Sequence, residues 1–153
     1  MFFDRRGNQI CTSVVSISII HVCEIRMTNQ TGLRVLIVED EPIVAMDLAE
    51  MLEGWGHTVI GPASRRALGV TLAQTEEIDF AILDVNLGRG ETSEDIAAAL
   101  RARGVRFMFL SAHNASTIDF RQGEDVMQKP VIVTQLEDRL RALAHTRVGQ
   151  QAS

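Results

Sequence analysis

The chain has 153 residues, of which 46% are hydrophobic and 23% charged, and its formal net charge is -5. This size and composition predict one globular domain with a sizeable core and exclude a disordered chain. The negative charge argues against nucleic acid as a partner, because phosphate backbones are bound by basic surfaces. No apolar run reaches the roughly eighteen residues of a membrane span, so we expect no membrane partner. The two cysteines, Cys11 and Cys23, have no metal-binding spacing, and a reduced, cytoplasmic setting is expected.

Residues 1–31 differ in character from the rest and are expected to form an N-terminal extension. Charged residues followed by an apolar, serine-rich run loosely imitate a signal peptide, but no small-residue cleavage site follows. The alternation of Val15, Ile17 and Ile19 is compatible with an added edge strand or a homodimer contact. The favoured interpretation is an overextended reading frame in which Met27 is the true start.

From residue 32 the chain alternates between strand-like and helix-like segments. Continuous apolar runs predict buried parallel strands, and apolar residues three and four apart predict helices. Strands are expected at 33–38, 57–60, 79–83, 105–110 and 124–128. A helix is expected to start at Pro42 and to be stopped by Gly54 and Gly56. Further helices are expected at 64–75, 93–103 and 132–143, with a weaker one at 115–121 and a turn at Gly61-Pro62.

Five strands alternating with five helices imply an α/β fold: a doubly wound, five-stranded parallel sheet with helices on both faces. The domain is expected to cover residues 32–145, followed by a flexible tail at 146–153. In such sheets ligands bind outside the carboxyl ends of the strands. The residues at those ends are therefore the first candidates for a functional site.

Polar side chains do follow the expected strands at this edge. Glu39 and Asp40 close the first strand, Asp84 closes the third, Ser111 the fourth and Lys129 the fifth. Carboxylates gathered this closely repel one another unless a cation neutralises them. The set therefore predicts a divalent cation site, with Lys129 supplying part of the neutralising charge.

Magnesium fits this set of oxygen ligands, because Mg²⁺ is commonly held by one or two carboxylates, waters and phosphate oxygens. Asp40 and Asp84 suit direct coordination, Glu39 suits contact through a water, and the backbone carbonyl of Asn86 offers a third protein oxygen. A carboxylate beside such a metal can attack phosphorus and become an aspartyl phosphate. Lys129 then fits as the cation that stabilises the transferring group, and Ser111 as a hydroxyl donor to it.

Each residue also has a plainer interpretation. The acidic pair Glu39-Asp40 suits a helix start, Ser111 suits a helix cap, and Lys129 alone suits a solvated surface position. His57 is expected to be structural, since it lies in the turn before the second strand. The coincidence of all the polar residues at one sheet edge favours the site over these separate interpretations.

Four segments resemble the receiver domain of two-component response regulators: 38–42, 82–87, 109–112 and 129–130. The resemblance covers residues 33 to about 143 in the family's order. It implies a flavodoxin-like fold in which Asp84 accepts a phosphoryl group from a sensor histidine kinase or a histidine phosphotransfer protein.

The same resemblance implies roles for the other residues of the site. Glu39 and Asp40 become the acidic pair for Mg²⁺, Ser111 takes the Ser/Thr switch position, and Lys129 becomes the phosphate-sensing lysine. The Lys129-Pro130 peptide bond is expected to be cis.

The chain departs from the family's pattern at two places, both in the residues that act as the conformational switch of the family. The family usually has Tyr or Phe three residues before its lysine, where this chain has Val126. The segment 109–113 is similar to the motif of stand-alone FAT GUY receivers, but Ala112 and His113 replace its glycine and aromatic residue. The phosphoacceptor residues match, so the departures bear on how a phosphorylated state is reported.

The resemblance leads to a single-domain response regulator that acts by binding a downstream protein or as a phosphate sink. Such a protein catalyses its own phosphorylation and dephosphorylation and turns over no separate substrate. One alternative is a Mg²⁺-dependent phosphatase with Asp84 as nucleophile, although Asn86 stands where that chemistry wants a general acid. Another is an interaction module that works without phosphorylation.

Overall fold

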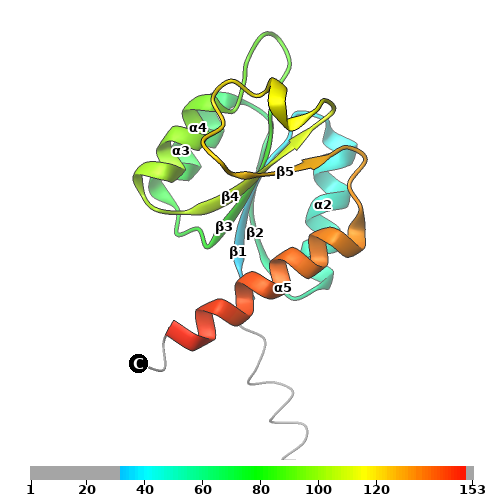
Figure 1. Cartoon of the computed structure of the whole chain (residues 1–153), viewed down its shortest axis with the longest axis vertical. Coiled ribbons are helices and arrows are strands. Elements are labelled where there is room, and N and C mark those ends of the chain that lie inside the picture. The colour runs from blue at the N-terminus through cyan, green and yellow to red at the C-terminus, as the bar shows by residue number, and fades with distance from the viewer. Residues whose placement is uncertain (1–31, 151–153) are drawn as a thin grey trace, which may run out of the picture. The chain divides into compact units, whose positions relative to one another are not determined.

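The structure is a computed structural model that describes residues 32–150, and the side chains as far as residue 144. The strand expected near Val15 and both cysteines lie outside the described residues. Five strands form one parallel sheet in the order β2-β1-β3-β4-β5 (Figure 1). Their bounds are β1 Arg34–Val38, β2 Thr58–Ala63, β3 Phe80–Asp84, β4 Arg106–Ser111 and β5 Asp125–Gln128.

Four α-helices cover the two faces of the sheet (Figure 1). Their bounds are α2 Pro42–Gly54, α3 Arg66–Thr75, α4 Glu94–Ala102 and α5 Val133–Gln150. Buried residues of α3 and α4 belong to one apolar cluster, and those of α2 and α5 belong to another. The expected doubly wound sheet with helices on both faces is therefore confirmed. No helix of the described residues is long and apolar enough to cross a membrane.

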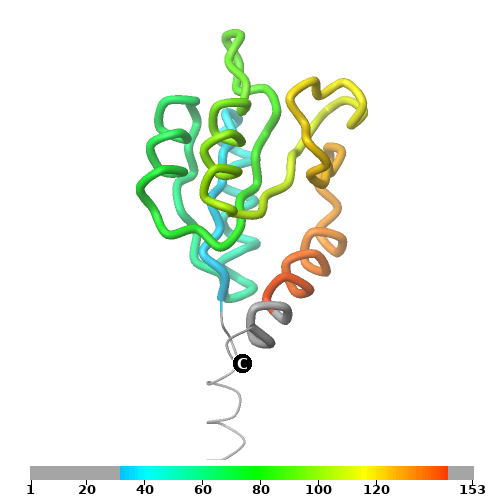
Figure 2. The backbone as a smooth tube through the Cα atoms, turned by 60° about the vertical axis from the view of Figure 1, so that its left-hand side comes forward, coloured from blue at the N-terminus to red at the C-terminus, as the bar shows by residue number. Residues whose placement is uncertain are grey.

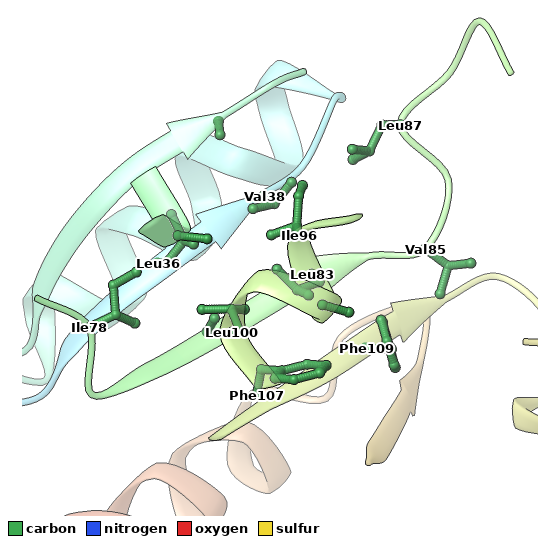
Figure 3. Packing of buried hydrophobic residues seen from close by; sticks show 14 of the residues in the cluster. Leu36, Val38, Ile78, Leu83, Val85, Leu87, Ile96, Leu100, Phe107 and Phe109 are labelled. Carbon is green, nitrogen blue, oxygen red and sulfur yellow. The ribbon is translucent and has the colours of Figure 1, made fainter. Parts of the chain in front are cut away.

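The three inner strands β1, β3 and β4 are mostly buried because their side chains on both faces are apolar. Every residue of β3 is buried, and Leu83 of β3 meets Val38 of β1 and Ile96 of α4 in one cluster (Figure 3). The chain passes from β1 to β2 on one side and from β2 back to β3 on the other, so the strand order reverses between β1 and β3. The carboxyl ends of these two strands flank the position where such folds bind ligands.

The connection between β4 and β5 differs from the expectation. A helix was expected at 115–121, but only Ala115–Thr117 forms a single 3₁₀ turn, so five expected helices become four. Ile118 is buried and the ring of Phe120 packs edge to face on Phe109, 5.5 Å between centroids. The backbone carbonyl of Phe120 accepts a hydrogen bond from the Arg101 guanidinium over 2.9 Å. Side-chain contacts to the sheet and to α4 thus replace the hydrogen bonds of a helix here.

Two boundaries also differ. The turn expected at Gly61-Pro62 lies inside β2, where the pairing with β1 shifts register and Gly61 has a φ of 91°. A Cβ atom at Gly61 would lie 2.8 Å from the backbone nitrogen of Ala63, so glycine allows the strand to continue through this irregularity. Helix α5 continues to Gln150, past the point at residue 146 where the tail was expected to begin.

Candidate functional site

Three carboxylates meet at the carboxyl ends of β1 and β3. Oxygen atoms of Glu39, Asp40 and Asp84 all lie within 4.8 Å of one another. Glu39 is only 1% exposed and Asp84 only 6% exposed. The two strands are direct neighbours, so the residues that end them are held side by side by the sheet itself. The sequence-based grouping of these three acids is therefore present in the structure.

The side chain of Lys129 enters the same cluster from the end of β5. Its Nζ atom donates to Oδ2 of Asp84 over 2.7 Å and to Oε2 of Glu39 over 2.8 Å. The backbone N–H of Lys129 donates to the carbonyl of Ser111 over 2.8 Å, which ties the ends of β4 and β5 together. The Lys129-Pro130 bond is cis, as expected. The lysine thus pairs with the two buried carboxylates of the cluster.

Burial and charge act in opposite directions on this pair of ionic groups. Burial raises the pKa of Glu39 above its usual value, and the hydrogen bond from Lys129 offsets this only in part. Burial lowers the pKa of Lys129, but its hydrogen bonds to Asp84 and Glu39 outweigh that and the pKa is raised overall. The lysine therefore remains charged at neutral pH and compensates part of the negative charge of the cluster.

Backbone groups hold two of the carboxylates in place. Oδ1 of Asp84 accepts from the N–H of Asn86 over 3.3 Å, and Oε1 of Glu39 accepts from the N–H of Glu41 over 3.1 Å. The Asn86 side chain itself is exposed. The second oxygen of Asp84 and the second oxygen of Glu39 are the ones that contact Lys129.

Ser111 is buried at the end of β4, one residue beyond the residue that pairs with Asp84. Its Oγ atom accepts a hydrogen bond from the N–H of His113 over 3.1 Å, which leaves the hydroxyl proton to be donated. Ser111 is not the helix cap suggested by the plainer interpretation, because the following 3₁₀ turn has Asn114 at its N-cap position. Its role toward a phosphoryl group remains a prediction.

The three carboxylates provide the oxygen ligands that a divalent cation prefers, and one of them, Asp40, is only half-buried. Lys129 neutralises one charge of three, so the cluster keeps an excess of negative charge for a cation. The loop after β3 approaches the cluster closely at Gly88, where a Cβ atom would lie 2.8 Å from Oδ2 of Asp40. This residue was not identified from the sequence, and the only local sequence signal is the pair of glycines on either side of Arg89.

His57 lies away from this edge and has the structural role expected for it. Its Nδ1 atom accepts a hydrogen bond from the N–H of Leu33 over 3.1 Å, at the start of β1. Burial lowers the pKa of His57, which favours the neutral ring that can accept this bond.

An apolar groove opens beside Lys129, between α2 and the segment that joins β5 to α5. Its apolar and proline residues are Val44, Leu48, Met51, Pro130, Val131 and Val133. On the same helix α2, Ile43 is 75% exposed and Met46 is 69% exposed.

Comparison with known proteins agrees with the fold. Residues 35–141 match the profile of the response regulator receiver domain. The phyllosphere-induced regulator PhyR of Methylorubrum extorquens is 38% identical over 81 residues, which are 52% of this chain and 30% of that protein. The transcriptional regulatory protein PdtaR of Mycobacterium tuberculosis is 45% identical over 56 residues, 37% of this chain and 27% of that protein.

A solved structure extends the comparison to the fold. The solution structure of SdrG from Sphingomonas melonis has a TM-score of 0.60 and 36% identity, and the alignment covers 73% of this chain and 96% of that one. The matched parts of PhyR and PdtaR are less than a third of those proteins, so the comparison with them concerns one domain. The receiver profile spans well over half of the chain, from β1 to α5. The chain therefore belongs to the family of response regulator receiver domains of two-component systems.

Proposed function

We propose that this domain accepts a phosphoryl group on Asp84 from the phosphohistidine of a sensor kinase or phosphotransfer protein, in a Mg²⁺-dependent reaction. One observation carries the proposal. The Lys129 ammonium contacts Asp84 at 2.7 Å and Glu39 at 2.8 Å, inside a cluster of three carboxylates. A nucleophile, a fixed positive charge and a place for a cation are thereby gathered at one point.

The reaction follows from these groups. A carboxylate oxygen of Asp84 forms a bond to phosphorus as the phosphorus–nitrogen bond of the donor breaks. The electron pair of that bond stays on the imidazole nitrogen, which takes up a proton from solvent. Lys129 offers its ammonium to the phosphoryl oxygens, where negative charge is concentrated. The N–H of Asn86 holds Oδ1 of Asp84 and so limits rotation of the nucleophile.

Glu39, Asp40 and Asp84 are the residues that would hold Mg²⁺, and Asn86 would add its backbone carbonyl. When bound, the ion supplies charge neutralisation for the phosphoryl oxygens during transfer. This chain's own contribution is to place the carboxylates within 4.8 Å of one another before any ion arrives.

A protein donor fits the surroundings of the site better than a small ester does. Lys129 itself lines the apolar groove, and helix α2, which forms one wall of it, also carries the exposed Ile43 and Met46. A donor helix docked in this groove would lie beside Lys129 and could present its histidine to Asp84. The domain catalyses its own phosphorylation and turns over no separate substrate in this proposal. Signalling would then follow from a changed affinity for a downstream protein.

The residue at position 86 argues against the alternative of a phosphatase. That chemistry needs an acid two residues after the nucleophile, and this chain has Asn86 there, with an amide that cannot protonate a leaving group. Steady release of phosphate from many small esters would nevertheless support that alternative.

The test is phosphorylation of the full chain with acetyl phosphate and Mg²⁺, and separately with a competent histidine kinase. We expect an acid-stable, alkali-labile adduct in wild type that is absent in Asp84→Asn and without Mg²⁺. Absence of an adduct with both donors would refute the proposal, and an adduct in Asp84→Asn would refute the assignment of the site.

A further inference from the structure

The loop between β3 and α4 is a small, well-tied hairpin over residues 86–92. The N–H of Leu87 donates to the carbonyl of Glu91, and the N–H of Glu91 donates to the carbonyl of Gly88, each over 2.9 Å. Asn86 and Thr92 pair as an antiparallel bridge. Figure 2 shows the hairpin as the narrow loop at the top of the view.

Contacts on both sides hold this hairpin to the domain. Leu87 is fully buried and lies in the apolar cluster with Val38 and Ile96 (Figure 3). Oε2 of Glu91 accepts a hydrogen bond from the N–H of Arg66, the first residue of α3, over 3.2 Å. The tip of the hairpin is therefore fixed in relation to the sheet.

At this tip the backbone of Gly88 faces the carboxylate of Asp40. Gly88 has a φ of 68°, and a Cβ atom built on it would lie 2.8 Å from Oδ2 of Asp40. Real side chains do not approach an oxygen that closely, so any other residue at 88 would displace the carboxylate. Gly90 also has a positive φ, 78°, but a Cβ atom there meets nothing within 4 Å.

We propose that Gly88 is a positioning residue for the cation site: its missing side chain leaves the space in which the Asp40 carboxylate reaches Glu39 and Asp84. The inference rests on the proposed function, because it assigns the cation to this cluster. It adds a residue from a separate loop that influences the cation affinity through Asp40 and does not itself coordinate the cation. Groups that orient a metal ligand change affinity by about 10- to 100-fold when they are altered.

The two glycines give a matched pair of variants. Gly88→Ala and Gly90→Ala both force alanine into a left-handed backbone, so both carry a similar conformational cost. Only Gly88→Ala places a methyl group against Asp40. The difference between them therefore isolates the contact from the general effect of stiffening the hairpin.

The first measurement is Mg²⁺ binding by calorimetry, with no phosphodonor present. We expect Gly88→Ala to bind Mg²⁺ at least about tenfold more weakly than wild type, and Gly90→Ala to stay within about twofold. The second is acetyl phosphate labelling across a Mg²⁺ series, in which Gly88→Ala should need about tenfold more Mg²⁺ for half of its maximal rate. Its maximal rate should approach that of Gly90→Ala, because the nucleophile and Lys129 are unchanged.

Equal Mg²⁺ affinities for the two variants would overturn the positioning role while leaving the proposed function intact. A lowered maximal rate with an unchanged Mg²⁺ requirement would overturn it too, because Asp40 would then not be the group affected. Failure of the wild-type chain to bind Mg²⁺ would refute both proposals. If Gly88→Ala does not fold, Gly88→Asn and Gly90→Asn replace the pair, since asparagine tolerates the left-handed region better.

Discussion

The Nζ atom of Lys129 lies 2.7 Å from Oδ2 of Asp84, although 45 residues separate them in the sequence. Parallel strands β3, β4 and β5 end at the same edge, which makes this contact possible. The same ammonium also contacts Glu39, the residue that follows β1. One positive charge thus connects the carboxyl ends of β1, β3 and β5. Its removal should therefore affect both the stability of the fold and the binding of a cation.

Lys129→Met should lower the free energy of unfolding at pH 7 by about 1–3 kcal/mol without Mg²⁺, because it leaves two buried carboxylates without their cation. Added Mg²⁺ should stabilise the variant more than wild type, since a bound cation then replaces the missing charge. Urea unfolding with and without Mg²⁺ measures both effects. Arg66→Met, which removes the exposed ion pair with Asp95, should cost under about 1 kcal/mol and show no added Mg²⁺ effect. Equal stabilisation by Mg²⁺ in wild type and Lys129→Met would contradict this account.

The Arg101–Glu124 ion pair anchors the loop between β4 and β5. Nε of Arg101 donates to Glu124 over 2.6 Å, and this hydrogen bond lowers the pKa of Glu124 to about 2. A carboxyl group with a lowered pKa stabilises the fold above its unfolded pKa, and the contribution disappears as pH falls from about 4.5 toward 2. Glu124→Gln should therefore cost about 1–3 kcal/mol at pH 7 and nearly nothing near pH 2.

Urea unfolding at a series of pH values tests this prediction. Glu137→Gln is the matched control, because it removes an exposed pair with Arg141 and should cost about 0.5 kcal/mol or less. A cost of Glu124→Gln that does not change between pH 7 and pH 3 would show that the charge of Glu124 is not the cause.

Helix α3 approaches α4 through Gly69. A Cβ atom at this position would lie 2.4 Å from Cδ1 of Ile96, so Gly69→Ala overpacks the contact between the helices. We expect a loss of about 1–2 kcal/mol even though alanine favours the helix by about 1 kcal/mol. Gly54→Ala, at the end of α2 with nothing within 4 Å, should instead be neutral or stabilising by up to about 1 kcal/mol.

Thermal and urea unfolding of Gly69→Ala and Gly54→Ala measure these changes in the free energy of unfolding. Ile96→Val removes Cδ1, so the double variant Gly69→Ala/Ile96→Val should lose less stability than the sum of the two single changes. If the stability loss of the double variant equals the sum of the two single losses, the contact with Ile96 is not the cause of the cost of Gly69→Ala.

A substitution of Met46 on α2 tests whether the phosphodonor protein docks at this helix. Met46→Glu should slow phosphorylation by a histidine kinase at least about tenfold, because a charge would be buried in an apolar contact. Phosphorylation by acetyl phosphate should be unchanged, since Met46 does not touch the carboxylates. Leu68→Glu, an equally large change on the exposed side of α3, is the control and should affect neither donor. An equal effect of both variants on the kinase reaction would argue against docking at α2.

The parallel sheet and the acidic cluster could both be predicted from the sequence. Buried parallel strands are continuous apolar runs, and Glu39 and Asp84 directly end two of them, so their meeting follows from strand order alone. The contact of Lys129 with both acids was anticipated as charge compensation, because three carboxylates need a cation nearby.

Other features depend on contacts that a local pattern does not contain. The segment after Ser111 has weak helical spacing, but Ile118 and Phe120 turn inward and Arg101 takes a backbone carbonyl, which no periodicity reveals. Val126, which stands where the family usually has Tyr or Phe, packs against the apolar cluster that contains Phe109, as Phe120 does. The approach of Gly88 to Asp40 depends on the hydrogen bonds and apolar contacts that hold the hairpin, and these involve residues distant in the sequence.

The position of Lys129 has an experimental consequence, because it is the only lysine in these 153 residues. A lysine-selective isotope label would give one side-chain signal, and that signal would come from between Glu39 and Asp84. Amine-directed reagents would likewise report on this position alone, apart from the amino terminus of the chain. The domain thus carries a built-in spectroscopic reporter whose signal would distinguish the free, cation-bound and phosphorylated states without any added label on its surface.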